Sequence, residues 1–151
     1  MVESRLQLPG LHTPRAIVRE FDAAINLELD FLQELKAAER MYHHFENLNV
    51  DVGVPKVFPK WSTRRMLVME LIHGVPLSQK MQELEPDGPA ARKLAHAVMD
   101  STYRQVFEFG IFHGDPHPGN LLVTEDNQLI YLDFGVTGTL TSAMQDTIIN
   151  A

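Results

Sequence analysis

The segment from Phe112 to Leu122, "FHGDPHPGNLL", most constrains what this chain can fold into. His113, Asp115 and His117 alternate in it, and on a strand they would share one face. Imidazole and carboxylate groups are competent metal ligands. The two prolines of the segment each remove a backbone donor and disfavour a regular strand. Three interpretations are open at this point: a three-ligand metal site, a tight turn with a hydrogen-bonded histidine, and a catalytic loop.

Composition excludes several classes of protein. The chain has 151 residues, 44% hydrophobic and 22% charged, which is typical of a soluble globular protein. The net charge of -7 disfavours nucleic acid as the main partner. Cysteine is absent, which excludes disulfides, zinc-cysteine sites and thiol catalysis. No apolar run approaches the ~20 residues of a membrane span, and the N-terminus lacks a signal-peptide pattern, so we expect a cytoplasmic chain.

The spacing of later residues favours the catalytic loop. Protein kinases combine an H-R-D-x-x-x-x-N loop with a later D-F-G. Here His113-Gly114-Asp115 precedes Asn120 at that offset, and Asp133-Phe134-Gly135 follows. The apolar runs "LLV" and "LIYL" around "TEDNQ" predict a β-hairpin between the two motifs. Asp115 would then accept the proton of an attacking hydroxyl, while Asn120 and Asp133 would bind Mg²⁺.

Helical periodicity is strong in two other segments. Thr13 and Pro14 suit a helix start, and the helical pattern runs to about Phe45, with a break inside it allowed. A second helix is predicted from Ala90 to Phe109, with Gly110 as its C-terminal cap. Between the helices, "KWSTRR" predicts a hairpin turn, "MLVMEL" a strand and "IHGVPL" a loop.

Some single residues have simpler structural interpretations. Trp61 is expected to anchor the hairpin with its ring half buried. His43 and His44 are expected on the surface at a helix end. Four methionines are expected to fill the core: Met66, Met69, Met81 and Met99.

The sequence resembles the UbiB/aarF-domain (ADCK-type) atypical kinases, a family linked to coenzyme Q (ubiquinone) biosynthesis. The matching segments are "ELDF", "VPKVFPKWSTRRMLVMELIHGVPL", "GIFHGDPHPGNLLV" and "LDFG", and they cover most of the chain from about Phe21. Gly114 departs from the H-A-D-P-H-P-G-N loop typical of the family. Aminoglycoside and choline kinase-like phosphotransferases carry similar loops, but are not expected to combine them with "ELDF" and "FPKWST".

The resemblance implies an α+β, protein kinase-like fold in two parts. Residues 1–71 would form a partial N-lobe, with a long αC-type helix, short strands and the hinge strand. Residues 72–151 would form the first part of a C-lobe, with a helix, the catalytic loop, the β-hairpin and the DFG segment. The sequence shows no glycine-rich phosphate loop, V-A-I-K-like strand or K-x-G-Q segment. We therefore expect a domain truncated at both ends, with exposed apolar surface and a tendency to self-associate.

The resemblance also places three carboxylates at the active site. Glu28 and Asp30 would gate or shape it, and Glu34 would pair with a strand lysine for which the chain shows no candidate. From the residues alone, Glu28 and Asp30 point about 200° apart on a straight helix, whereas Asp30 and Glu34 share a face. A solvated helix face is the simpler alternative for all three.

The strand "MLVMEL" would lead to the hinge between the lobes. Met69 would border the adenine pocket, and backbone groups of Glu70, Leu71 and Ile72 would bind the adenine edge. The alternative is a buried strand followed by a turn.

These residues point to an atypical kinase or ATPase that uses ATP and Mg²⁺. The isolated chain is expected to be weakly active or inactive, because the phosphate clamp is missing. A pseudokinase-like scaffold and a small-molecule phosphotransferase of the aminoglycoside or choline kinase type are the alternatives. By resemblance, a nucleotide is the expected ligand, and a peripheral membrane position with quinone-biosynthesis partners is implied.

Overall fold

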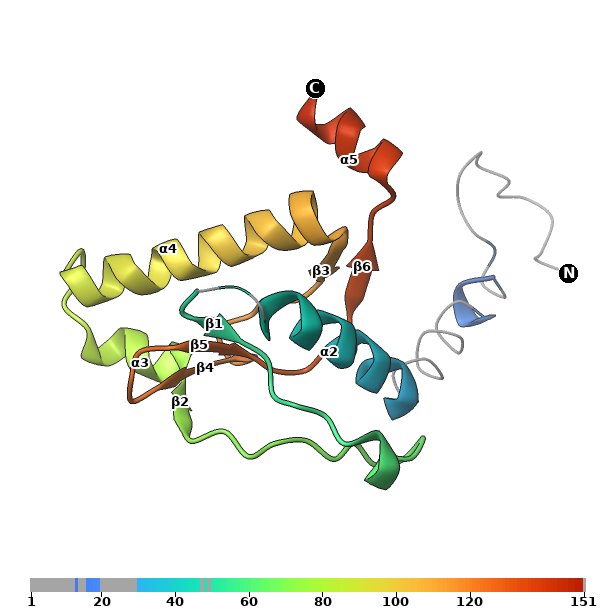
Figure 1. Ribbon diagram of the computed structural model, residues 1–151, viewed down its shortest axis with the longest axis horizontal. Helices are drawn as coiled ribbons and strands as arrows, with labels where there is room; N and C mark the ends of the chain where they lie inside the picture. Colours follow the sequence, from blue (N-terminus) through green and yellow to red (C-terminus); the bar gives the residue numbers. More distant parts are fainter. Residues whose placement is uncertain (1–12, 14–15, 20–29, 47, 49, 151) are drawn as a thin grey trace, which may run out of the picture.

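A computed structural model of the chain describes residues 13, 16–19, 30–46, 48 and 50–150, and shows helices around a small sheet (Figure 1). The α+β class is therefore confirmed. In chain order the elements are α2 (Phe31–Glu46), β1 (Val52–Gly53), the 3-10 turn η1 (Pro59–Trp61), β2 (Gly74–Pro76), α3 (Leu77–Glu83), α4 (Pro89–Arg104), the π-helical turn η2 (Gln105–Phe109), β3 (Ile111–His113), β4 (Leu121–Thr124), β5 (Leu129–Tyr131), β6 (Thr137–Thr139) and α5 (Ser142–Ile149).

The main sheet has four short strands in the order β1-β5-β4-β2. Strands β4 and β5 form the predicted hairpin, with Leu121 opposite Tyr131. Strand β1 pairs with β5 in parallel, with Val52 opposite Leu129. A second sheet joins β3 to β6 antiparallel, and β6 directly follows the DFG segment. The sheets therefore bring segments from both halves of the sequence next to the predicted catalytic loop.

The prediction of a loop over "IHGVPL" is wrong in part. Strand β2 lies within it and pairs antiparallel with β4, with Val75 opposite Val123. Pro76 is tolerated there because β2 is an edge strand. The strand predicted over residues 66–71 forms isolated bridges instead, one of them between Val57 and Met69. That bridge and the one between residues 63 and 66 confirm the hairpin turn.

The long N-terminal helical pattern is broken at Asp30, which is not helical. Its Oδ1 accepts the backbone N–H of Leu32 at 3.2 Å, so Asp30 caps the start of α2. Further upstream, Thr13 Oγ1 accepts the N–H of Ala16, as an N-cap should, and residues 16–19 are helical. The break matters for the site, because α2 begins its own register at Phe31.

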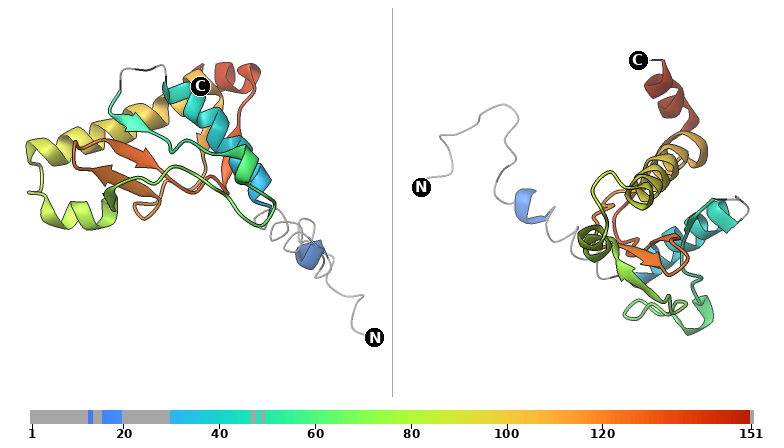
Figure 2. Two further views of the ribbon diagram at one scale, coloured as in Figure 1. Left: turned by 60° about the horizontal axis from the view of Figure 1, so that its bottom comes forward. Right: turned by 90° about the vertical axis from the view of Figure 1, so that its left-hand side faces the viewer.

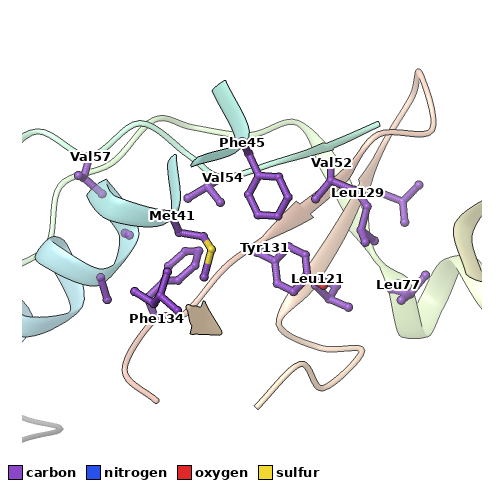
Figure 3. Close-up of a cluster of buried hydrophobic side chains, with 14 of the residues drawn as sticks. Met41, Phe45, Val52, Val54, Val57, Leu77, Leu121, Leu129, Tyr131 and Phe134 are labelled. Atoms are coloured by element: carbon purple, nitrogen blue, oxygen red, sulfur yellow. The ribbon is translucent and has the colours of Figure 1, made fainter. Parts of the chain in front are cut away.

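The core lies between α2 and the sheet. Figure 3 shows Phe45 pointing toward Tyr131, and Met41 pointing toward Phe134 of the DFG segment. The rings of Phe45 and Tyr131 stack with centroids 6.4 Å apart. From α4, Ser101 Oγ shares a buried hydrogen bond of 2.9 Å with Tyr131 Oη. Apolar burial of this kind is worth about 25 cal/mol per Å² and holds α2 and α4 against the hairpin.

Four assignments of single side chains, one histidine and three methionines, are wrong. The His44 ring is half-buried and stacks on Phe109, with centroids 4.4 Å apart. Met41, which was not singled out, is the fully buried methionine. Three of the four expected core methionines are instead exposed: Met66 (51%), Met81 (60%) and Met99 (71%). Trp61 lies against Phe58 at the hairpin and is 57% exposed.

The second predicted helix is confirmed as α4 followed by η2. Gly110 ends it with φ +64°, a left-handed conformation, and a Cβ there would lie 2.8 Å from the Leu140 carbonyl oxygen. Helix α5 stands beyond β6, away from the main sheet (Figures 1 and 2). No helix in the part of the chain that the structure describes is long and apolar enough to cross a membrane.

Candidate functional site

His113 joins the catalytic loop to the DFG segment. Its Nε2 lies 2.9 Å from the Leu132 carbonyl oxygen and must donate to it. Its Nδ1 accepts the N–H of Asp115 at 3.2 Å. His113 as a whole is 5% exposed. Its ring can make both bonds only as the neutral tautomer that carries its proton on Nε2. His113 therefore braces the loop, and His117 does the same by accepting the N–H of Gly119 at Nδ1.

These bonds exclude the three-ligand metal site. Both ring nitrogens of His113 are occupied, and Nδ1 of His117 accepts a backbone N–H. Among the described residues there is no group of three or more His, Cys, Asp or Glu side chains that could hold a metal ion. The histidines therefore shape the loop, and the chemistry is left to the residues around them.

The loop and the hairpin bring Asn120 and Asp133 together. The N–H of Leu132 donates to the Asn120 carbonyl at 2.8 Å, which fixes the residue before Asp133 against the loop. Asn120 Nδ2 donates to the Asp115 carbonyl at 3.2 Å. The Asp115 side chain is exposed, and its carboxylate makes no hydrogen bond or ion pair within the described residues. It is therefore free to accept a proton from a bound hydroxyl.

Asp133 has an unusual backbone. Its φ is +55°, a left-handed conformation that is uncommon outside glycine. Its Oδ1 accepts the N–H of Gly135 at 3.2 Å, while Phe134 is buried at 2% exposure. The turn buries the phenylalanine and leaves Asp133 exposed. Residual backbone strain of this kind clusters at functional sites.

Glu34 reaches the DFG segment from α2. Its Oε1 accepts the N–H of Phe134 at 3.2 Å. Burial raises the pKa of Glu34, the Phe134 N–H opposes this, and the charge of Asp133 raises it further. No lysine or arginine pairs with Glu34 in the described part of the chain. Glu34 therefore holds the DFG backbone and takes part in no ion pair with the residues that the structure describes.

The other two helix carboxylates lie differently. Glu28 is outside the described residues. Asp30 caps α2 and forms an ion pair with Arg64, with Oδ2 lying 3.1 Å from both Nε and Nη2. Across the described ranges, no hydrogen bond joins Asp30 to Asp115 or Asp133. The active-site role inferred for Glu28 and Asp30 stays a prediction.

The predicted hinge is extended. The N–H of Glu70 donates to the Lys56 carbonyl at 2.8 Å, and its carboxylate accepts the Lys56 N–H at 3.2 Å. Met69 is half-buried against the core, as a residue at the back of a pocket would be. Leu71 is 78% exposed. Within the described residues, no hydrogen bond engages the backbone groups of Leu71 and Ile72.

The donor set suits Mg²⁺ carried by a nucleotide. Mg²⁺ usually takes one or two carboxylates, with water and substrate phosphates completing its octahedron. Asp133 offers a carboxylate whose Oδ2 makes no hydrogen bond among the described residues. Asn120 uses its Nδ2 as a donor, which leaves Oδ1 as the ligand atom. Asn120 and Asp133 therefore fit Mg²⁺ as a pair.

Sequence reasoning missed Gln105. Gln105 is 2% exposed, and its Oε1 accepts the backbone N–H of His113 at 2.8 Å. A signal was present, because Leu94, Val98, Ser101 and Gln105 follow one another at helical spacing on one face of α4. Two polar side chains on such an apolar face indicate buried hydrogen bonds.

Comparisons with known proteins point to one protein family. The model of the ABC1 atypical kinase-like domain matches residues 2–151. A chloroplast protein of Arabidopsis thaliana, "ACTIVITY OF BC1 COMPLEX KINASE 3", is 36% identical over 120 residues, which are 80% of this chain and 17% of that protein. A Clostridium pasteurianum protein from the 5′ region of hydrogenase 1, described as uncharacterized, is 34% identical over 145 residues, 94% of this chain and 26% of that protein.

Among solved structures, the chain is similar to a Mycobacterium tuberculosis protein described as the complex of Rv3197 with erythromycin. The TM-score is 0.71 at 23% identity, over 93% of this chain and 34% of that one. This likeness confirms the kinase-like fold. The chain spans about a quarter or less of the length of the two curated relatives.

Proposed function

Because this chain belongs to the ABC1 atypical kinase-like family, we propose that it carries the Mg²⁺ and base side of an ATP-dependent phosphoryl-transfer site of the UbiB type. One observation carries the proposal. The bond from Leu132 N–H to the Asn120 carbonyl ties the residue before Asp133 to Asn120, the other candidate metal ligand, and the Asp115 carboxylate makes no hydrogen bond or ion pair with the described residues. The longer protein would be an atypical kinase or ATPase, and its resemblance to the UbiB members links it to ubiquinone biosynthesis.

Each residue then has a part that phosphoryl transfer requires. Asn120 Oδ1 and the Asp133 carboxylate would hold Mg²⁺, which would supply charge neutralisation at the β- and γ-phosphates. Asp115 would accept the proton of the attacking hydroxyl. The backbone groups of Leu71 and Ile72, which form no hydrogen bond within the described ranges, would bind the adenine edge. Positioning and electrostatics supply most of the catalysis in reactions of this class.

Thermal unfolding with Mg-ATP, with Mg-ADP and without ligand tests the proposal. A ligand at a hundred times its Kd stabilises a protein by about 2.7 kcal/mol. We expect a shift that requires magnesium and that Asp133→Asn abolishes. Asp126→Asn is the matched control, because Asp126 is exposed at the other end of the same hairpin. A wild-type protein that melts cooperatively and shows no shift would contradict nucleotide binding by this chain.

A binding module without catalysis is the second candidate. It is favoured by Glu34, which binds the Phe134 N–H and has no cationic partner among the described residues. The variant Asp115→Asn separates the two candidates. If the chain is a catalyst, this variant keeps the Mg-ATP shift and loses ATP hydrolysis. If the wild type binds Mg-ATP and its turnover does not exceed that of the variant, the chain is a nucleotide-binding scaffold.

A further inference from the structure

Gln105 occupies a position where one helix, one strand and the candidate site meet. It is the first residue of η2, and its backbone N–H is shared between the carbonyls of Ser101 and Thr102. Single π-helical turns occur frequently at functional sites, because the extra residue redirects a side chain. The side chain of Gln105 turns to β3, where its Oε1 accepts the N–H of His113. The turn thus connects α4 to the loop histidine.

The main-chain N–H of His113 has no other acceptor in the ladder of β3. Strand β3 pairs with β6 on one side only, and the next residue, Gly114, donates to Val136 across that pair. Because neighbouring N–H groups of a strand alternate in direction, that of His113 points away from β6. Without Gln105, the buried N–H of His113 would have no acceptor, which is energetically costly. We expect β3 to shift until this N–H finds another acceptor.

A displacement of β3 would act directly on the imidazole. The ring bridges two segments at once, through Nε2 to the Leu132 carbonyl and through Nδ1 to the Asp115 N–H. Leu132 precedes the candidate ligand Asp133, and Asp115 is the candidate base. Both bonds, at 2.9 and 3.2 Å, allow little movement of the ring.

Only one orientation of the Gln105 amide can accept the N–H of His113. Only Oε1 accepts hydrogen bonds, so it must face His113. In that orientation Nε2 is buried and finds no partner within the described residues. A leucine or methionine would pack there without this unpaired donor, so the glutamine carries a desolvation cost that they would not. Its use lies in the bond to His113.

We propose that Gln105 is a positioning residue of the phosphoryl-transfer site, which sets the His113 tautomer and, through it, the separation of Asp115 and Asp133. The inference rests on the proposed function for its catalytic meaning. The bond from the His113 N–H to Gln105 Oε1 does not depend on any nucleotide, so the proposed effect on the ring can be tested without one.

The test compares Gln105→Met with Gln145→Met. Methionine keeps the length of glutamine and removes its acceptor. Gln145 is the matched control, because it donates to the Val106 carbonyl at 2.8 Å on the same turn and makes no bond to His113. The readouts are the ¹⁵N signals of the His113 ring, assigned with a His113→Gln variant, the melting temperature, and the Kd of Mg-ATP.

We expect the wild type and Gln145→Met to show a single Nε2–H tautomer at His113. Gln105→Met should give a tautomer mixture and weaken Mg-ATP binding by about 10- to 100-fold, as loss of an outer partner of a metal site does. Both variants should melt at lower temperature. An unchanged ring spectrum in Gln105→Met would overturn the proposal, even if stability falls.

If Gln105→Met does not fold, Gln105→Glu and Gln105→Asn carry the test. Glutamate retains an oxygen at the same reach and should keep the tautomer, whereas asparagine is one methylene shorter and should lose it. Identical ring spectra for the two would overturn the proposal. If the wild type binds no Mg-ATP, the proposed function fails, and the ring spectrum still decides the role of Gln105.

Discussion

Glu34 shows how one side chain can serve the site without touching a substrate. Its carboxylate accepts the N–H of Phe134 at 3.2 Å, and Phe134 itself is buried. Burial and the charge of Asp133 raise the pKa of Glu34, so ionised Glu34 is held there at a cost. The hydrogen bond to the DFG backbone offsets part of that cost. At this scale, Glu34 matters as an acceptor more than as a charge.

The acceptor role predicts different outcomes for two substitutions at Glu34. Glu34→Gln keeps an oxygen for the Phe134 N–H and should fold with a stability close to that of the wild type. Glu34→Ala leaves this buried donor unsatisfied and should lower the free energy of unfolding by about 1–3 kcal/mol. Urea denaturation of the three proteins measures the difference. Equal losses in both variants would show that the charge of Glu34 stabilises the fold.

Single residues also mark where prediction from the sequence succeeds. Gly110 was predicted to end the second helix and does so with φ +64°, because its signal is local. Gln105 was missed, since its partner His113 lies across a turn that periodicity does not reveal. The kinase-like spacing predicted Asp115, Asn120 and Asp133 as site residues, which stays a prediction, whereas the Glu34 bond to Phe134 required the fold.

At the scale of elements, α2 and η2 are joined through His44 and Phe109. Their rings stack at 4.4 Å with an interplanar angle of 8°. Burial lowers the pKa of His44 below its ordinary 6.5, and the charges of Arg40 and His43 lower it further. Folding thus favours the neutral ring, and protonation of His44 opposes the contact between the two elements.

This contact predicts a pH dependence of stability. Between the lowered pKa and 6.5, the folded chain binds fewer protons at His44 than the unfolded chain does. The free energy of unfolding should therefore rise with pH through that window. The contribution of neutral His44 is complete above pH 6.5 and is lost as pH falls through the lowered pKa. His44→Phe keeps the stacking and removes the titration, so its stability should vary less with pH there. Denaturant midpoints measured across this window check the slope, and parallel curves for the two proteins would refute it.

Elements whose partners are close in sequence were predicted well. The β4–β5 hairpin and α4 follow from alternation and helical periodicity. Strand β2 was missed because it pairs with β4 far along the chain, and its own residues, "GVP", read as a turn. The break at Asp30 was allowed for but not located, since a capping aspartate inside an apolar periodicity resembles a helix surface residue.

At the scale of the whole molecule, a cavity of about 520 Å³ opens between α3 and α4. Leu77 and Leu94 are buried at its base, and Met81 and Met99 line it while remaining 60% and 71% exposed. Apolar surface of this kind is commonly covered by another protein surface. The expectation of methionines inside the core was wrong here, because thioether side chains at helical spacing fit a groove wall as well as a core.

The groove predicts concentration-dependent self-association of the isolated chain. Met99→Glu places a charge on the groove wall and should raise the dimer dissociation constant at least ~10-fold, which corresponds to about 1.4 kcal/mol. Sedimentation equilibrium measures it. Met144→Glu on α5 is the control, because Met144 is also exposed and does not line the groove. A wild type that is monomeric at every concentration, or equal effects of both variants, would contradict an interface at the groove.

The bond between Glu34 and Phe134 joins residues 100 positions apart. Strand β1 likewise pairs with a strand far along the chain, β5, with Val52 opposite Leu129. During synthesis, helix α2 leaves the ribosome long before either partner exists, and closing such long loops costs entropy before any contact compensates for it. The apolar face of α2, with Met41 and Phe45, therefore spends most of translation uncovered. We therefore expect the candidate site to form late in folding. Until then the uncovered apolar face of α2 makes the nascent chain prone to aggregation.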